Sequence, residues 1–330
     1  GMVQGKGLAH VIKERYGRGL LTGAVMLLVI ANVVNIGADL GAMAASLKLL
    51  FGFSFTWWLM LIATVTLVLE IFVPYRRYAK YLKYLALSLV AYVITAIIVT
   101  TDWREAVINT ILPDIIFRKE YLMVLVAILG TTISPYLFFW QASEEVEEEI
   151  AHRRLKNMED GNPTLTARDM HSMQTDTVIG MAISNVIMFF IILTAASTLF
   201  PNGITQITSA ADAAEALRPL AGQFTFLLFA LGIVGTGLLA IPILAGSASY
   251  AVSESFGWAD GLYQKASRAP AFYLVIAIAT LLGIILNLVS SIDPFRMLYY
   301  AAILNGLIAP PLLFIILHLA NDPKVVGLHV

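Results

Sequence analysis

The chain alternates long apolar stretches with shorter polar ones. The apolar runs cover residues 19–51, 53–73, 81–100, 121–141, 176–200, 222–252, 271–291 and 296–320. Each run is near or above the roughly 20 residues that a helix needs to cross a bilayer. The first run is longer than one crossing requires, so its helix has to tilt or protrude. The pattern predicts an all-α membrane protein with about eight transmembrane helices.

The fourth run carries a helix breaker. In 121–141, YLMVLVAILGTTISPYLFFWQ, Pro135 lies near the middle, beside Thr131, Thr132 and Ser134. Proline has no amide hydrogen and its ring crowds the carbonyl four residues back, so the Thr131 carbonyl loses its helical partner inside the membrane. In transporters, unwound backbone at this depth commonly binds the substrate or its coupling ion. The alternative is a structural proline kink whose freed groups are satisfied by neighbouring helices.

Polar residues also follow one face of the first run. Asn32, Asn35 and Asp39 are spaced by three and four residues, which places them on one side of a helix. An ionisable residue inside a span usually marks an ion route, and Asp39 is such a residue. Alternatively these side chains only bond other helices, since Gly37 and Gly41 on the same helix predict close helix contact. The two interpretations are compatible.

Two buried amides in the last two runs need partners as well. Asn287 and Asn305 each lie within an apolar segment, where an unsatisfied amide is costly. Either side chain could face a central cavity or a neighbouring helix.

Composition agrees with the apolar pattern and excludes several functions. Hydrophobic residues make up 59% of the 330 residues, charged residues 13%, and the mean hydropathy is +0.81. The chain has no cysteine, which excludes disulfides and thiolate metal ligands. No G-x-S-x-G, P-loop or H-E-x-x-H motif occurs, and the basic residues are too few for nucleic-acid binding. We therefore expect neither an enzyme nor a bound cofactor.

The distribution of basic residues predicts the orientation. Lys and Arg are retained on the cytoplasmic side of membrane proteins. With residue 1 inside, 15 of the 21 basic residues fall on the inner side. This places both termini in the cytoplasm, together with the polar segment 142–175, which we expect to be a loop. No detachable domain is visible, so 1–330 is predicted to be a single transmembrane domain.

Three segments resemble the bacterial Nramp-like divalent metal transporters. They are ANVVNIGADLGAMAASLKLLFG, GTTISPYLFFWQASEEVEEE and ALRPLAGQFTFLLFALGIVGTGLLAIPILAGSASYAVSESFGW. The resemblance implies the leucine-transporter-type fold of two inverted five-helix repeats. It also implies that the eight runs are helices three to ten, so that helix one and most of helix two would be missing from the chain.

The resemblance also implies where an ion would bind. Members of this family hold the ion at an unwound helix with a Met-Pro-His element and a carbonyl one turn earlier, which match Ser134, Pro135, Tyr136 and the Thr131 carbonyl. A second family histidine matches Gln141. Serine in place of methionine replaces a soft ligand by a hard oxygen, which favours Mg²⁺ or Mn²⁺. In this respect the chain resembles the magnesium-transporting members.

The sequence thus predicts a carrier of divalent metal cations in the bacterial inner membrane, working by alternating access around residues 131–136. Thr131 and Ser134 are the predicted metal ligands, and the ion is a transported substrate. The residues predicted to line its pathway are Asp39, Asn35, Thr132, Tyr136, Gln141 and Asn305. Two alternatives remain open: a sodium-coupled carrier of amino acids or amines with the same fold, and a non-conducting membrane fragment.

Overall fold

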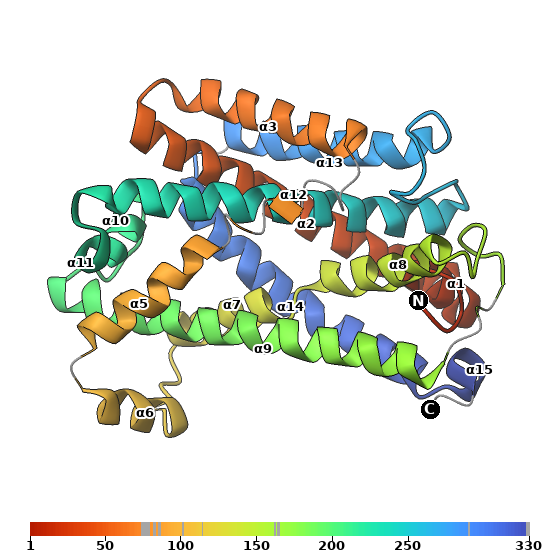
Figure 1. Ribbon diagram of the computed structural model, residues 1–330, viewed down its shortest axis with the longest axis horizontal. Helices are drawn as coiled ribbons and strands as arrows, with labels where there is room; N and C mark the ends of the chain where they lie inside the picture. The colour runs from red at the N-terminus through yellow and green to blue at the C-terminus, as the bar shows by residue number, and fades with distance from the viewer. Residues whose placement is uncertain are drawn as a thin grey trace.

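The computed structural model describes residues 1–73, 80–81, 84, 87–100, 102–113, 115–161, 163, 166–289 and 291–327. These residues form helices and connecting segments (Figure 1). The long helices are α2 (Arg18–Phe51), α3 (Phe55–Phe72), α9 (Ala167–Thr198), α12 (Thr225–Phe256), α13 (Pro270–Val289) and α14 (Pro294–Ala320), together with the pair α7 (Lys119–Thr132) and α8 (Pro135–Ala151).

Shorter helices connect or flank the long ones. They are α1 (Leu8–Tyr16), α5 (Val90–Val99), α6 (Trp103–Ile111), α10 (Ala210–Ala214), α11 (Arg218–Ala221) and α15 (Pro323–Val326), with 3₁₀ turns at Leu87–Leu89, Phe200–Asn202, Glu215–Leu217 and Gly222–Phe224.

The expected all-α membrane architecture is confirmed. Within the described ranges, seven helical stretches are long and apolar enough to cross a membrane, with α7 and α8 counted as one. The segments Leu87–Val99 and Trp103–Ile111, bent by 117° at their junction, bring the number to eight if they form one span. The predicted run 81–100 lies partly outside the described residues.

The segment 142–175, expected to be a loop, is helical at both ends. Helix α8 continues to Ala151, because its run of glutamates is compatible with a helix even where the chain becomes polar. Helix α9 begins earlier than its apolar run, because Thr166 and Asp169 form a capping box at its start. The connecting segment is therefore 152–166, of which residues 162, 164 and 165 are not described.

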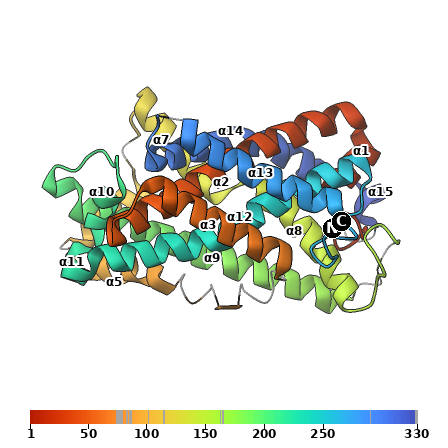
Figure 2. The ribbon, with the colours of Figure 1, turned by 90° about the horizontal axis from the view of Figure 1, so that it is seen from above.

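Helix α2 lies at the centre of the molecule and packs against α3, α12, α13 and α14 (Figures 1 and 2). Its glycines permit close approach, as the sequence predicted. A methyl group on Gly37 would lie 3.2 Å from the Gly283 carbonyl oxygen, and one on Gly41 would lie 2.2 Å from the Asn287 amide oxygen. Asn287 donates to the Gly37 carbonyl at 2.6 Å. Its amide therefore joins α13 to α2.

The two halves of the broken span pack on different helices. Helix α7 interlocks with α14, since a methyl group on Gly130 would lie 1.9 Å from the Ala302 carbonyl oxygen and one on Gly306 would lie 2.2 Å from the Val126 carbonyl oxygen. Helix α8 packs on α12. A movement of α14 relative to α12 would therefore separate the two halves at the break.

The first residues of the chain and helix α15 lie at the same end of the molecule as the carboxyl end of α8 (Figure 1). The Gln4 side chain donates to the Val325 carbonyl. Arg15 on α1 pairs with Asp322, with Nε and Oδ2 2.6 Å apart. Both terminal segments therefore lie at one end of the molecule, and α10 and α11 lie at the opposite end.

Candidate ion site at the helix break

The predicted break in the fourth run is present. Helix α7 ends at Thr132, Ile133 and Ser134 are non-helical, and α8 starts at Pro135. The Ile133 amide donates to the Leu129 carbonyl at 2.8 Å. Pro135 offers no amide hydrogen to the Thr131 carbonyl, and no other hydrogen bond to this carbonyl occurs within the described part of the chain. The Thr131 oxygen is thus available for a ligand.

The three hydroxyls at the break all donate back into α7. Thr131 and Thr132 each donate to the Ile128 carbonyl at 2.7 Å. Ser134, which is 2% exposed, donates to the Gly130 carbonyl at 2.9 Å. A hydroxyl that donates its one hydrogen still has lone pairs. These oxygens can therefore accept hydrogen bonds from ion-bound water or coordinate a cation directly.

The side chains of Thr131 and Ser134 lie in different surroundings. Thr131 is exposed on the surface of the described chain, whereas Ser134 is buried. The Thr131 hydroxyl lies 3.9 Å from the Met188 sulfur on α9. The two predicted metal ligands therefore differ: Thr131 offers its carbonyl, and Ser134 offers its hydroxyl.

Tyr136 connects the break to Asp39. Tyr136 lies in the first turn of α8, and its phenol makes a side-chain hydrogen bond with Ser134 and interacts electrostatically with the Asp39 carboxylate on α2. Asp39 is half-buried and accepts no hydrogen bond from any described residue. Asp39 is thus an acidic group without a hydrogen-bond partner among the described residues, and it interacts with the first turn of α8 through Tyr136.

Asn35 and Asn305 pair with each other. Asn35 Nδ2 donates to Asn305 Oδ1 at 3.1 Å, and Asn305 Nδ2 donates to Asn35 Oδ1 at 3.2 Å. Asn35 also donates to the Ala31 carbonyl at 2.8 Å. This reciprocal pair joins α2 to α14, the helix that holds α7, so both amides act here as links between helices.

Asn32, on the same face of α2, faces a different helix. Its Nδ2 donates to the Leu244 carbonyl on α12 at 2.8 Å, whereas its Oδ1 is buried without a hydrogen-bond partner. The polar face of α2 therefore contacts both α12 and α14, the helices that hold the two halves of the broken span.

The structure does not bring Gln141 to the break. Gln141 is seven residues beyond Ser134, about 10 Å further along α8. Its amide donates to Glu145 Oε1 at 2.5 Å, on the same helix.

One contact at the break was not predicted from the sequence. Ser247 on α12 is fully buried, and its hydroxyl donates to the Tyr136 carbonyl at 2.9 Å. One residue earlier, a methyl group on Gly246 would lie 2.5 Å from the Trp140 ring. Small residues in α12 thus let α8 approach closely. In the sequence, only the run of small residues GSAS at 246–249 indicates this close contact.

The candidate site is made mainly of neutral oxygens. Among the described residues, no group of three or more His, Asp or Glu side chains could hold a metal ion. The donors present are the Thr131 carbonyl and the Ser134 hydroxyl, and Asp39 on α2 interacts with the neighbouring Tyr136 phenol. Such oxygens suit hard cations such as Mg²⁺. The carboxyl end of α7 adds the negative end of a helix dipole.

The apolar helices, the interrupted span and the polar residues beside it define a polytopic α-helical membrane protein with a discontinuous span. The model of the Nramp family, described as natural resistance-associated macrophage protein-like, matches residues 1–330. The chain belongs to this family, which confirms the resemblance seen in the sequence.

A curated relative supports the same assignment. The chain is 23% identical to the divalent metal cation transporter MntH 1 of Pseudomonas aeruginosa over 248 residues, which cover 72% of this chain and 53% of the relative. The chain therefore spans about half the length of the curated relative that it matches.

Proposed function

We propose that the protein carries divalent metal cations across the membrane and binds the ion at the break between α7 and α8. The observation that supports this most directly is the Thr131 carbonyl, which is left without a helical partner at the break. Membership of the Nramp family and the similarity to a divalent metal cation transporter agree with it. We also propose that the protein lies in the bacterial inner membrane with both termini in the cytoplasm, because most of its basic residues then fall on the inner side.

The donor set favours Mg²⁺ or Mn²⁺ over softer metals. Ser134 offers a hydroxyl, Thr131 a carbonyl, and Asp39 a charge within electrostatic range of the Tyr136 phenol. Hard oxygen ligands select hard cations, whereas thioether and thiolate ligands select softer ones.

We propose alternating access because the two half-helices pack on different helices. Helix α7 is interlocked with α14 through Gly130 and Gly306, and α8 is attached to α12. Relative motion of α12 and α14 would therefore open one side of the break or the other while the ion stays between them. Ile133 and Ser134 are the residues that would absorb the change in backbone angles.

Flux measurements test the proposal and the site separately. Purified protein in liposomes is expected to take up Mg²⁺ or Mn²⁺. Ser134→Leu should reduce the uptake by about tenfold or more, because it removes a buried hydroxyl and fills the site with apolar atoms. The matched control is Ser184→Leu, a serine exposed on α9.

Three results would contradict parts of this proposal. Absence of metal uptake by the wild-type protein would exclude transport of these ions. Equal uptake by Ser134→Leu and Ser184→Leu would exclude the site. Sodium-driven amino acid uptake by the same vesicles would favour the other kind of carrier.

A further inference from the structure

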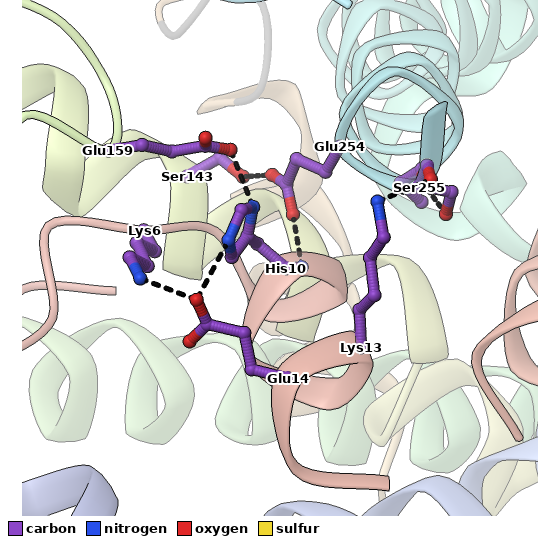
Figure 3. Close-up of polar contacts among 9 residues, drawn as sticks. Lys6, His10, Lys13, Glu14, Ser143, Glu159, Glu254 and Ser255 are labelled. Carbon is purple, nitrogen blue, oxygen red and sulfur yellow. Dashed lines mark hydrogen bonds and ion pairs between the residues drawn. The ribbon is translucent and has the colours of Figure 1, made fainter. Parts of the chain in front are cut away.

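A polar cluster joins four segments at the end of the molecule that holds both chain ends (Figure 3). It contains Lys6 before α1, His10 and Glu14 on α1, Ser143 on α8, Glu159 in the segment after α8, and Glu254 on α12. We call these six residues the His10 cluster. It lies away from the helix break and takes no part in the ion site described above.

Glu254 attaches α8 to α12 and α1. Its carboxylate is 2% exposed, accepts from the Ser143 hydroxyl at 3.0 Å and accepts from the His10 backbone amide at 3.1 Å. A methyl group on Gly7 would lie 1.7 Å from Glu254 Oε1, so the chain before α1 is also fitted closely around this carboxylate. The inner half of the broken span is therefore held by a hydrogen bond that must break if α8 leaves α12.

The His10 ring lies between two carboxylates. Nε2 is 3.1 Å from Glu14 Oε1, and Nδ1 is 2.6 Å from Glu159 Oε1 (Figure 3). Nδ1 is buried and has no aligned hydrogen-bond partner. Its interaction with Glu159 is therefore electrostatic and not a hydrogen bond. A neutral imidazole carries no charge to attract Glu159, whereas imidazolium can donate from Nε2 to Glu14 and attract the Glu159 carboxylate through its positive charge. Only the protonated ring therefore interacts favourably with both carboxylates.

The backbone holds Glu159 in place against His10. Glu159 has φ +68°, in the left-handed region that a residue other than glycine seldom adopts. Its amide donates to the Gly5 carbonyl at 2.9 Å. Conformations of this kind persist only where surrounding contacts hold them, and here those contacts place a carboxylate beside a histidine.

The groups around His10 are mostly negative. Lys6 Nζ lies 2.7 Å from Glu14 Oε1, and this hydrogen bond lowers the pKa of Glu14, which therefore stays ionised in mild acid. Glu159 and Asp260 interact with Glu254 from the neighbouring loops. Lys13, the other nearby base, is turned to the Ser255 carbonyl at 2.8 Å. Within the His10 cluster, Lys6 is paired with Glu14, and Glu159 faces His10 as a second carboxylate.

We propose that His10 is a regulatory proton-binding site that controls the inner end of α8. With a proton bound, the ring bridges Glu14 and Glu159 and holds the segment after α8 against α1. Without it, one of the two contacts is lost and α8 separates from α12 more readily. The ligand is a proton from the solution on this side of the membrane, and acid on that side slows transport. This inference rests on the proposed function, because a gate requires a transported ion.

The movement can be measured without transport. The chain has no cysteine, so Glu148→Cys on α8 and Phe256→Cys on α12, both at exposed positions, give a unique pair of spin labels. Histidine changes charge between about pH 5 and pH 8. We expect a longer distance between the labels to gain population at about pH 8 relative to about pH 5.5. His10→Gln should remove this dependence, and His171→Gln, an exposed histidine on α9, should retain it.

Flux gives the second readout. With the external pH fixed, acidifying the side that carries the His10 cluster should slow metal flux roughly two- to fivefold, the range expected for ion pairs that are partly exposed. His10→Gln should lose this effect and His171→Gln should keep it. Glu159→Gln, which leaves His10 in place, should weaken the effect as well.

The outcomes separate the two proposals. If the label distance is insensitive to pH, or if His10→Gln responds to pH as the wild type does, the proton site is wrong. If the distance responds through His10 but no protein conducts Mg²⁺ or Mn²⁺, the proton site stands and the proposed function fails. Thermal melting of each variant shows whether a lost response reflects unfolding.

Discussion

At the residue scale, the burial of Asp260 predicts how the stability of the protein depends on pH. It lies between α12 and α13, outside the apolar helices, and is 7% exposed. Burial, followed by the negative charges of Glu159 and Glu147, raises its pKa from 3.8 to about 7. The folded protein therefore binds a proton that the unfolded chain releases between about pH 4 and pH 7.

The sign of the effect follows from this proton. The folded state binds more protons than the unfolded state in that interval, so the contribution of Asp260 to stability is present below about pH 4 and is lost as the pH rises through about 7. In detergent, the melting temperature of Asp260→Asn should fall less from about pH 5 to pH 8 than that of the wild type. Asp176→Asn, an exposed aspartate on α9, is the control. Parallel pH profiles for wild type and Asp260→Asn would refute the assignment.

The sequence predicted which residues are polar within the membrane, but not their partners. Asn305 was expected to need a hydrogen-bond partner, and Asn35 to line the pathway or bond another helix; the two amides pair with each other across 270 residues of chain. Spacing along one helix shows which side chains share a face. It contains no information about the distant helix that covers the face. For this reason Ser247, which binds the Tyr136 carbonyl, was also missed.

At the element scale, the contact of α7 with α14 depends on glycine. A side chain at Gly130 would collide with the backbone of Ala302, which cannot rotate away. Gly130→Ala should therefore lower the free energy of unfolding by about 1–3 kcal/mol through overpacking. Gly180→Ala on α9, where a methyl group meets nothing within 4 Å, should be neutral or stabilising by up to about 1 kcal/mol. Melting temperatures check both, and equal values would exclude the interlocked contact.

The ends of elements were harder to predict than their presence. The break at Pro135 was predicted at the right residue, because proline acts through its own covalent structure. The segment 142–175 was predicted as a loop from its polarity, yet both of its ends are helical. Polarity indicates that a segment meets water or other polar groups, and a helix can do so as well as a loop.

At the scale of the whole molecule, the orientation in the membrane is a prediction that labelling can check. Lys156→Cys and Gln206→Cys are exposed positions in the connections on either side of α9, and each would be the sole cysteine of the chain. The basic residues predict that the first lies in the cytoplasm and the second outside. In intact cells an impermeant maleimide should label Gln206→Cys, and Lys156→Cys only after permeabilisation. The reverse pattern would invert the orientation.

The unequal attachment of the two half-helices has a consequence for the whole molecule. Helix α7 is joined to α14 by interlocked backbones, which water cannot replace, whereas the contact of α8 with α12 includes side-chain hydrogen bonds, which water can replace one by one. Water can therefore loosen the contact of α8 with α12 more easily than the contact of α7 with α14. We therefore expect heat or damage to separate α8 from α12 before it separates α7 from α14.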